Sequence, residues 1–247
     1  TAKKIGEAFL ERRGEITLHV RTDRIAVDVF RDRLNEAGIT CRPGYYHKDA
    51  LILEGSCDIR DLPGYKEGLF FVQDESSMLP VLCAGIRPGE CVIDVCSAPG
   101  GKAMHALMEL QGKGGLLARD VSEAKVSRIR ENIKRMQFPD VTFQVWDAAV
   151  PDPDNREKAD VVLADVPCSG IGIIGRKPEI KYHALESAAE LVPLQRNICR
   201  ASAGLLKPGG VMIYSTCTIH HAENEENVMW MEENLGLERE SLDEYLP

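Results

Sequence analysis

The chain has 247 residues, of which 44% are hydrophobic and 28% charged, as is typical of a globular protein with a substantial core. Its apolar runs are too short to span a membrane and no signal-peptide pattern is present, so we expect neither a membrane nor a secreted protein. Residues 222–247 hold nine acids and one base, which account for −8 of the net charge of −9. The rest therefore carries only −1 and could still present a basic face to a nucleic acid.

Eight cysteines are scattered along the chain, and no two of them form a CxxC pair. This spacing indicates neither a zinc site nor a disulfide framework, so no metal is expected. Free thiols are typical of a reducing compartment, which predicts a cytoplasmic protein.

Residues 1–72 are predicted to form a small α+β module. Helical spacing is found over Lys3–Arg13 and alternation typical of a strand over Ile16–Val20. Thr22 or Asp23 is expected to cap a second helix that Gly38 ends, with an apolar face of Val27, Phe30, Leu34 and Ala37. Strands follow at 39–41 and 50–53. A β-α-β-β order of this kind favours a ferredoxin-like or RRM-like module.

The charge of this module leaves its role open. It contains twelve bases and twelve acids, with Tyr45 and Tyr46 close to Arg42. A solvated surface and an RNA-contacting face are both compatible with this composition.

Residues 73–247 alternate short apolar strands with amphipathic helices. Strands are predicted at 91–95, 116–120, 141–146, 160–164 and 211–215, and helices at 76–84, 102–110 and 186–206, with a further helix capped by Ser122. This alternation predicts an α/β fold with a doubly wound parallel sheet.

A glycine-rich loop follows the first of these strands, over Asp94–Lys102 (DVCSAPGGK). Its glycines allow close approach to a ligand, and it matches neither GxGxxG nor GxxxxGK[ST], so neither a dinucleotide nor a nucleoside triphosphate is favoured. Each of four predicted strands ends with a carboxylate, and a carboxylate in such a position can bind the ribose hydroxyls of a ligand. The four are Asp94, Asp120, Asp147 and Asp165. A single such residue is usually a turn or cap, but four together predict S-adenosylmethionine.

Two cysteines also follow predicted strands, in Asp165–Gly170 (DVPCSG) and Tyr214–Cys217 (YSTC). The carboxyl ends of parallel strands form the ligand-binding edge of an α/β sheet. Cys168 and Cys217 are therefore expected at that edge, where a thiolate can act as a nucleophile. Cys41, Cys57, Cys83, Cys91 and Cys199 are interpreted as small apolar residues.

From about Ile16 to its end the chain resembles the RsmB/Sun (Fmu) family of RNA 5-methylcytosine methyltransferases. The motifs are QDESS (73–77), DVCSAPGGK, DVPCSGIG, YSTC and ENE (223–225), and KEGLFFVQ (66–73) and RKPEIK (176–181) resemble the bacterial 16S rRNA branch most closely. The resemblance implies a small RNA-binding-type module (1–72) and an S-adenosylmethionine-dependent methyltransferase domain (73–247) that acts on RNA, most closely small-subunit rRNA.

The resemblance also implies roles for individual residues. Cys217 would bond to carbon 6 of cytosine, Asp165 would stabilise the base at N3, and Cys168 would assist release. The implied cofactor-binding residues are Cys96, Ser97, Ala98, Pro99, Gly100, Gly101, Lys102, Asp120, Asp147 and Asp165. The implied substrate contacts are Gln73, Ser77, Lys177 and Lys181, with Arg176 beside them.

The chain departs from the family pattern in several places. Ser97 stands where the family usually has Ala, and Arg119 replaces an apolar residue and would need a partner if buried. Bacterial members usually have a NusB-like N-terminal domain and a final glycine- and phenylalanine-rich strand, which do not occur here. With Thr rather than Met at its start, the chain is expected to be a fragment.

Two other functions remain open at this level. In a DNA cytosine methyltransferase the nucleophile would be Cys168, and a non-catalytic scaffold could dock on rRNA with the same fold. The sequence indicates neither the target nucleotide nor the oligomeric state.

Overall fold

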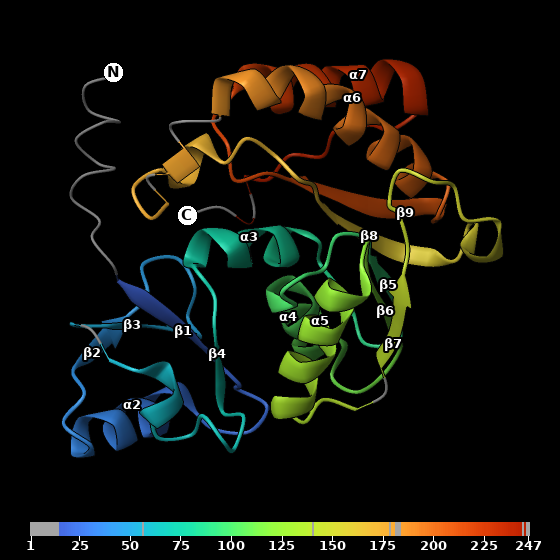
Figure 1. Ribbon diagram of the computed structural model, residues 1–247. Coiled ribbons are helices and arrows are strands. Elements are labelled where there is room, and N and C mark those ends of the chain that lie inside the picture. Colours follow the sequence, from blue (N-terminus) through green and yellow to red (C-terminus); the bar gives the residue numbers. More distant parts are fainter. Residues whose placement is uncertain are drawn as a thin grey trace.

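The computed structural model describes residues 15–55, 57–139, 141–177, 179–180, 184–243 and 245, and for 184–189 the backbone alone. The helix predicted at Lys3–Arg13 lies outside these residues. The described chain forms a four-stranded and a five-stranded sheet (Figure 1). Within it, no helix combines the length and apolar character that a membrane span requires.

The smaller sheet is antiparallel, with strand order β2-β3-β1-β4. Its strands are β1 (Ile16–Val20), β2 (Cys41–Pro43), β3 (Ala50–Leu53) and β4 (Phe70–Val72). Helix α2 (Val27–Glu36) buries Phe30 and Leu34 against the sheet. The order agrees with the predicted ferredoxin-like module, although the short 3₁₀ turn η1 (Ile59–Asp61) stands where that fold has a second helix.

Two details of the predicted module are wrong. Helix α2 begins after Ala26, so neither Thr22 nor Asp23 caps it. Their side chains are engaged elsewhere: the Thr22 hydroxyl donates to Asp49 and the Asp23 carboxylate pairs with Arg21. The strand predicted at 39–41 begins only at Cys41, because the Ile39 amide donates to the Leu34 carbonyl at the helix end.

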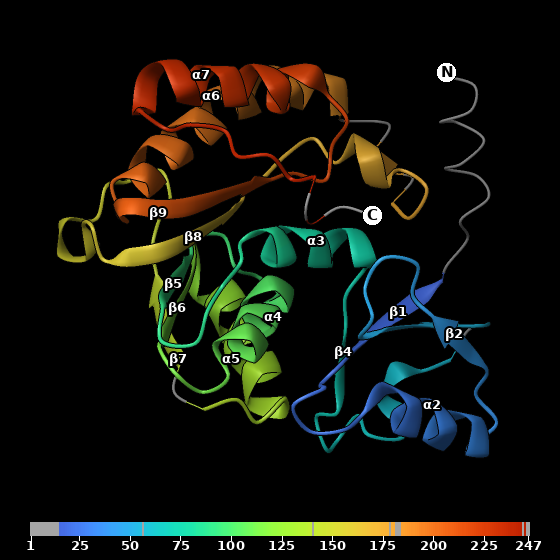
Figure 2. The same ribbon diagram turned by 180° about the vertical axis from the view of Figure 1, so that it is seen from behind.

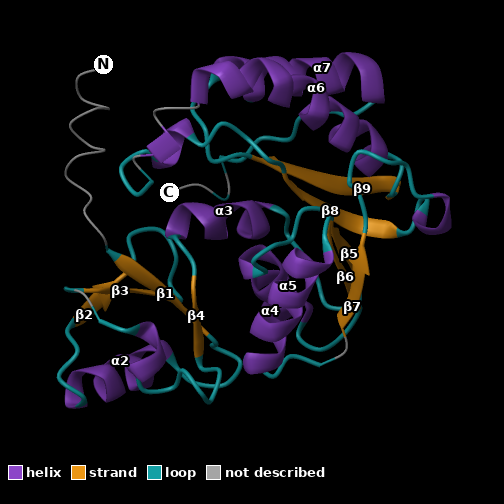
Figure 3. Ribbon diagram, viewed as in Figure 1, coloured by secondary structure: helices purple, strands orange, loops and turns teal. Residues whose placement is uncertain are grey.

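The larger sheet is parallel, with order β7-β6-β5-β8-β9. The strands are β5 (Cys91–Asp94), β6 (Gly115–Asp120), β7 (Val141–Val145), β8 (Ala159–Asp165) and β9 (Leu206–Ser215). The helices are α3 (Glu75–Cys83), α4 (Gly101–Leu110), α5 (Glu123–Arg135), α6 (Ala184–Ala203) and α7 (Glu225–Leu235). Figures 2 and 3 show helices on both sides of this sheet.

Side chains that alternate along the strands bury both faces of this sheet. Val161 and Leu163 of β8 pack into a cluster with residues of α3, α4 and α5. Val162 and Ala164 of the same strand pack into a second cluster, which includes Ile198 of α6. Strands buried on both faces are the reason for the continuous apolar runs in the sequence. The predicted doubly wound fold is therefore confirmed.

The order in which successive strands are added to the sheet reverses between β5 and β8, which lie side by side and parallel although β6 and β7 separate them in the sequence. Ligands of doubly wound folds bind in the crevice at such a switch point, outside the carboxyl ends of the strands. The Asp94–Lys102 loop leaves β5 here, and the Asp165–Gly170 loop leaves β8. Ser122 does precede α5, but its side chain makes no capping hydrogen bond.

Candidate active site

The five strands of the parallel sheet deliver polar residues to one edge. Asp94, Asp120 and Asp165 are the last residues of β5, β6 and β8, and Ser215 is the last residue of β9. Asp147 lies two residues beyond β7. Along this edge, in the strand order β7-β6-β5-β8-β9, Asp147 is followed by Asp120, Asp94 and Asp165. The loops that carry Cys168 and Cys217, called the thiol loops below, leave the last two strands.

The loop after β5 passes close to the neighbouring strand. The Ser97 amide donates to the Arg119 carbonyl at 2.8 Å, and the Ala98 amide donates to the Asp120 carboxylate at 3.0 Å. Gly100 has a φ of +105°, a conformation that side chains disfavour, and it leads directly into α4. These hydrogen bonds therefore fix the loop against β6, at the amino end of α4.

Asp94 and Ser97 are buried within this loop, and neither side chain meets hydrogen-bond geometry with a described residue. Asp94 is 1% exposed, and neither of its carboxylate oxygens accepts a hydrogen bond from the described residues; nor does the Ser97 hydroxyl form one. Burial raises the pKa of Asp94 to about 7 and outweighs the nearby polar groups of Ser97 and Cys96, which act in the opposite direction. Unpaired polar atoms in such a place are expected at a ligand site.

The next two carboxylates differ in their surroundings. Asp120 is 4% exposed, and its oxygens accept hydrogen bonds from the amides of Ala98 and Val121, with Lys125 Nζ 2.9 Å away. Asp147 is exposed and accepts the Ala149 amide. Asp120 thus fixes the loop, whereas Asp147 is open to solvent.

Asp165 joins the cofactor loop to the thiol loops. Its carboxylate accepts a hydrogen bond from Lys102 Nζ at 2.7 Å and another from the Ser215 hydroxyl at 2.7 Å. Lys102 lies in the first turn of α4 and Ser215 ends β9. The three neighbouring elements thereby converge on one carboxylate.

The two thiols lie side by side. The sulfur atoms of Cys168 and Cys217 are 3.2 Å apart, and the Cys217 amide donates to the Cys168 sulfur at 3.1 Å. The hydrogen bond with Cys168 lowers the pKa of Cys217 to about 7, and the same bond together with burial raises the pKa of Cys168. Cys217 is exposed and Cys168 is half-buried. The arrangement therefore favours a thiolate on the accessible sulfur of Cys217.

A buried carboxylate fixes the loop that carries Cys168. Glu223 is fully buried and accepts hydrogen bonds from the Ser169 amide (2.9 Å), the Ser169 hydroxyl (2.5 Å) and the Gln195 side chain (2.9 Å). Gln195 also donates to the Pro167 carbonyl and accepts from Asn227. Side chains of α6 and α7 thus hold the Cys168 loop in place.

The loop that carries Cys217 is fixed in a similar way. The Asn224 amide group donates to the carbonyls of Thr218 and His220 and accepts from the Thr216 hydroxyl. Gly172 lies so close that a Cβ atom there would be 2.8 Å from the Cys217 carbonyl oxygen. Only glycine therefore allows the two loops to meet.

The predicted substrate residues that the structure describes lie on two neighbouring segments, which the Arg176–Asp74 pair joins. Gln73 is 5% exposed, and its amide is engaged by His19 and by the Ser77 carbonyl; its contact with substrate stays a prediction. Ser77 is half-buried and Lys177 is exposed. Arg176 pairs with Asp74, so its charge is already neutralised. Lys181 lies outside the described residues.

The remaining predicted positions are buried or paired. Cys96 is half-buried, and burial raises the pKa of its thiol. Arg119, the departure from the family pattern, is 1% exposed and has the partner it needs in Asp152 at 2.5 Å. Gln195 and Asn227 were missed by sequence reasoning because no motif contains them. Glu223 was noted only within the ENE motif.

Comparisons with known proteins agree with this geometry. The model of the family described as 16S rRNA methyltransferase RsmB/F matches residues 82–237, more than half of the chain. The ribosomal RNA small subunit methyltransferase B of Vibrio cholerae is 39% identical over 199 residues, which cover 79% of this chain and 45% of that protein. Its counterpart in Serratia proteamaculans is 37% identical over 212 residues, covering 85% and 48%. The chain spans about half the length of these curated relatives.

Two solved structures from Pyrococcus horikoshii share the fold. A methyltransferase homolog is 31% identical with a TM-score of 0.80, over 94% of this chain and 74% of that one. NSun6, solved with SFG, is 22% identical with a TM-score of 0.85, over 94% and 83%. The motif positions, the sheet order and the family match together place the chain in the RsmB/F family of 16S rRNA methyltransferases.

Proposed function

We propose that this chain transfers a methyl group from S-adenosylmethionine to carbon 5 of a cytosine in RNA, most directly small-subunit rRNA, through a covalent bond between Cys217 and the base. The single observation that carries the proposal is the pair of sulfur atoms 3.2 Å apart beside the Asp165–Lys102 pair. The names of the relatives in Vibrio and Serratia support rRNA as the substrate.

The loop after β5 fits the cofactor. The unpaired Asp94 carboxylate and Ser97 hydroxyl, and the glycine backbone at the start of α4, suit a polar ligand with an amino-acid tail. The residues proposed to hold it are Cys96 to Lys102, with Asp120, Asp147 and Asp165 along the same edge. When bound, S-adenosylmethionine supplies an electrophilic methyl carbon. The related fold of NSun6 was solved with SFG, an analogue of this cofactor.

Cytosine needs a nucleophile because its carbon 5 is itself a weak one. The Cys217 thiolate adds to carbon 6, which opens the C5=C6 bond and makes carbon 5 nucleophilic. Negative charge develops at N3, where a proton delivered through Asp165, whose carboxylate accepts a hydrogen bond from Lys102, can stabilise the base. The target base must leave its stack to reach these groups.

Release of the base requires the second thiol. Once carbon 5 carries the methyl group and Cys217 is still bonded to carbon 6, the Cys168 proton passes to solvent and the Cys168 sulfur takes the proton from carbon 5. The C5=C6 bond then re-forms and Cys217 leaves as a thiolate. The half-buried position of Cys168 and its raised pKa suit a base better than a first nucleophile. This favours Cys217 over the DNA-type assignment, in which Cys168 attacks.

The smaller sheet is proposed to contact the RNA. Its last strand ends at Val72, which supports the division into a 1–72 module and a 73–247 methyltransferase domain. Tyr45 and Tyr46 are 66% and 53% exposed, and the Arg42 guanidinium lies 4.4 Å from the Tyr45 ring centre. Aromatic and arginine side chains of this kind stack on unpaired bases.

All eight cysteines are unpaired, which supports a reducing cytoplasm.

One experiment tests the roles of the thiols. Wild type, Cys168→Ala and Cys217→Ala are incubated with labelled cofactor and small-subunit rRNA, with Cys57→Ala as a control for an exposed thiol elsewhere. We expect Cys217→Ala to lose methyl transfer by about 10³-fold or more without an adduct. Cys168→Ala should accumulate a covalent protein–RNA adduct.

The other outcomes are equally informative. An adduct in Cys217→Ala and none in Cys168→Ala would make Cys168 the nucleophile. Binding of rRNA without methyl transfer by wild type would support the scaffold instead. Because the chain covers about half of its relatives, a full-length relative serves as the positive control.

A further inference from the structure

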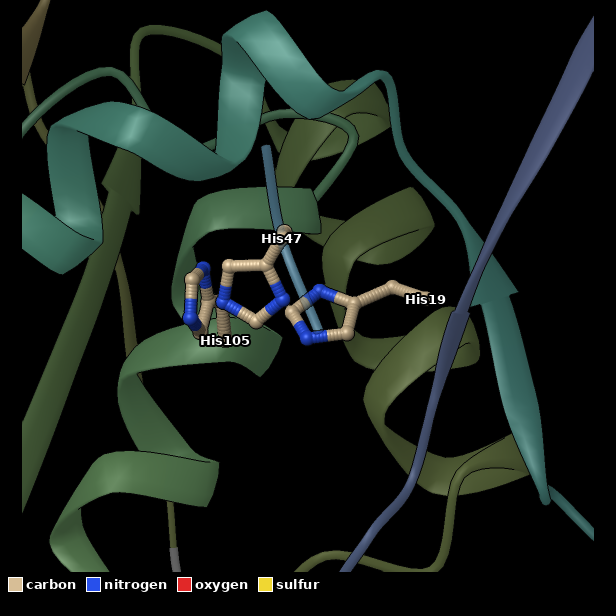
Figure 4. A group of neighbouring side chains, drawn as sticks. All are labelled: His19, His47 and His105. Carbon is tan, nitrogen blue, oxygen red and sulfur yellow. The ribbon is translucent and has the colours of Figure 1, made fainter. Parts of the chain in front are cut away.

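Three histidines from separate segments meet in the interior. His19 lies on β1, His47 in the β2–β3 loop and His105 on α4, so the cluster joins the small sheet to the methyltransferase fold (Figure 4). One ring nitrogen of each lies within 4.8 Å of the other two. The three are 0%, 6% and 0% exposed. No cysteine contributes, so a search for CxxC spacing could not find this group.

The cluster contains polar atoms that the described chain leaves unsatisfied. His19 Nε2 and both ring nitrogens of His105 are buried without a hydrogen-bond partner. A buried polar atom without a partner destabilises the folded chain relative to a paired one. The charged neighbour Glu109 reaches His105 Nε2 only at 3.6 Å. A single cation placed between the rings would bind a lone pair from each of them.

Neighbouring groups hold the His19 ring and the His47 backbone in place. His19 Nδ1 donates to Gln73 Oε1 at 2.9 Å, which leaves the lone pair on Nε2. The His47 backbone is fixed because its amide and those of Tyr45 and Tyr46 donate to Glu75. Metal-binding histidines usually have such a partner on the second ring nitrogen.

We propose that His19, His47 and His105 form a binding site for a divalent transition metal, for which Zn²⁺ is the best match. Three imidazoles with no thiolate suit Zn²⁺, and the hard cations Mg²⁺ and Ca²⁺ prefer oxygen ligands. Tetrahedral Zn–N bonds of about 2.1 Å place the nitrogens about 3.4 Å apart, so the rings need to approach by roughly 1 Å. The Asp49 amide donates to His47 Nδ1, and metal binding breaks this bond through either nitrogen: Nδ1 would give its lone pair to the metal, and binding through Nε2 would move the proton to Nδ1.

The fourth position can face solvent. A cavity of about 830 Å³ is lined by His47 and Glu109, together with Lys48 and Asp49. Water or the Glu109 carboxylate can therefore complete the site. His105 lies one turn after Lys102 on α4, and Lys102 donates a hydrogen bond to Asp165. A metal bound to His105 would therefore also fix the helix that positions Lys102. We assign it a structural role, as a clamp between the two sheets.

The test measures binding of Co²⁺ and Zn²⁺ to the purified, chelator-treated chain. The catalytic thiols are removed by the Cys168→Ala/Cys217→Ala double substitution, so that they cannot bind the metal. We expect about one Co²⁺ per chain with the visible absorption of a four-coordinate site and no thiolate charge-transfer band. Zn²⁺ should displace it.

His47→Gln in the same background should weaken the affinity by about 100-fold or more. His221→Gln, at an exposed histidine outside the cluster, is the matched control and should leave it unchanged. Circular dichroism shows whether the His47 variant is folded. Absence of stoichiometric Co²⁺ and Zn²⁺ binding in the background protein, or equal affinity in His47→Gln, would overturn the proposal and leave a metal-free histidine core.

Discussion

Two buried carboxylates on opposite sides of the site have contrasting surroundings. Glu223 accepts hydrogen bonds from two groups of Ser169 and from Gln195. Asp94 is equally buried, yet neither of its oxygens accepts a hydrogen bond from the described residues. A carboxylate that is buried with its donors supports the structure, whereas one buried without them is costly to ionise.

The contrast distinguishes the thiol side of the site, which hydrogen bonds within the protein hold in place, from the cofactor side, where polar atoms lack a partner. On the thiol side Glu223 and Asn224 hydrogen-bond the loops that carry Cys168 and Cys217, so both loops are positioned before any substrate arrives. On the cofactor side Asp94 and Ser97 have no hydrogen-bond partner among the described residues. Polar atoms that a ligand could bind are therefore left free in the loop where we propose that the cofactor binds.

The largest effect is expected for Glu223→Ala. The substitution leaves buried donors of Ser169 and Gln195 without an acceptor, each at a cost of about 1–3 kcal/mol. We expect the free energy of unfolding to fall by about 3–5 kcal/mol in a denaturant titration. Methyl transfer should be lost as well, because the Cys168 loop loses its support.

Glu233→Ala is the matched control, since Glu233 is an exposed residue of α7. It should change the free energy of unfolding by less than about 0.5 kcal/mol. Equal effects of the two substitutions would show that Glu223 is not the anchor of the loop.

The second prediction concerns Asp94 and pH. Its pKa is about 7 when folded against 3.8 as the ordinary value, so the folded chain binds more protons than the unfolded chain between these limits. Stability should therefore fall as pH rises from about 4 to 7 and stay low above 7. Asp94→Asn removes this loss, so the variant without cofactor should be more stable than wild type at pH 8, by on the order of 2–4 kcal/mol.

The measurement is thermal or denaturant unfolding of both proteins from about pH 4 to 8. The difference between them isolates Asp94 from the other acids and should vanish near the lower limit. A difference that does not change with pH would mean that Asp94 ionises freely in the folded chain.

The third prediction concerns the thiols that lie between these two regions. Cys168→Ala removes the hydrogen bond that lowers the Cys217 pKa to about 7, so this pKa should rise towards its ordinary value of 9.0. Alkylation of Cys217 at neutral pH should then slow by about 5–20-fold. Peptide mass spectrometry follows Cys217, with exposed Cys57 as internal control. An unchanged alkylation rate would show that Cys168 does not activate Cys217.

Much of the fold can be predicted from the sequence because its causes are local. Strands buried on both faces leave apolar runs such as 161–164, and the loop residues follow directly at the strand ends. Asp94, Asp120 and Asp165 could therefore be assigned to one sheet edge from the amino-acid sequence alone. Their roles remain proposals, because position at that edge does not establish what they bind.

The rest depends on contacts between distant segments. In the sequence Gln195 and Asn227 look like ordinary polar residues of amphipathic helices. Their role in fixing the Cys168 loop becomes visible only where α6 and α7 pack beside that loop. The predicted cap at Thr22 was wrong because Asp49, far along the chain, binds its hydroxyl. His19 and His105 likewise share no motif with His47, and the three meet only in the folded protein.

The smallest expected effect compares two buried serines, one in each half of the site. The Ser169 hydroxyl binds Glu223 and Thr218, whereas the Ser97 hydroxyl has no partner in the described chain. Ser169→Ala should lower the free energy of unfolding by about 1–2 kcal/mol, because a hydrogen bond to a charged group is lost. Ser97→Ala should be neutral or slightly stabilising, because it removes an unpaired buried hydroxyl. Denaturant titration of both variants without cofactor measures the two changes in the free energy of unfolding. Equal destabilisation by the two substitutions would mean that the Ser97 hydroxyl is as well satisfied in the folded chain as the Ser169 hydroxyl.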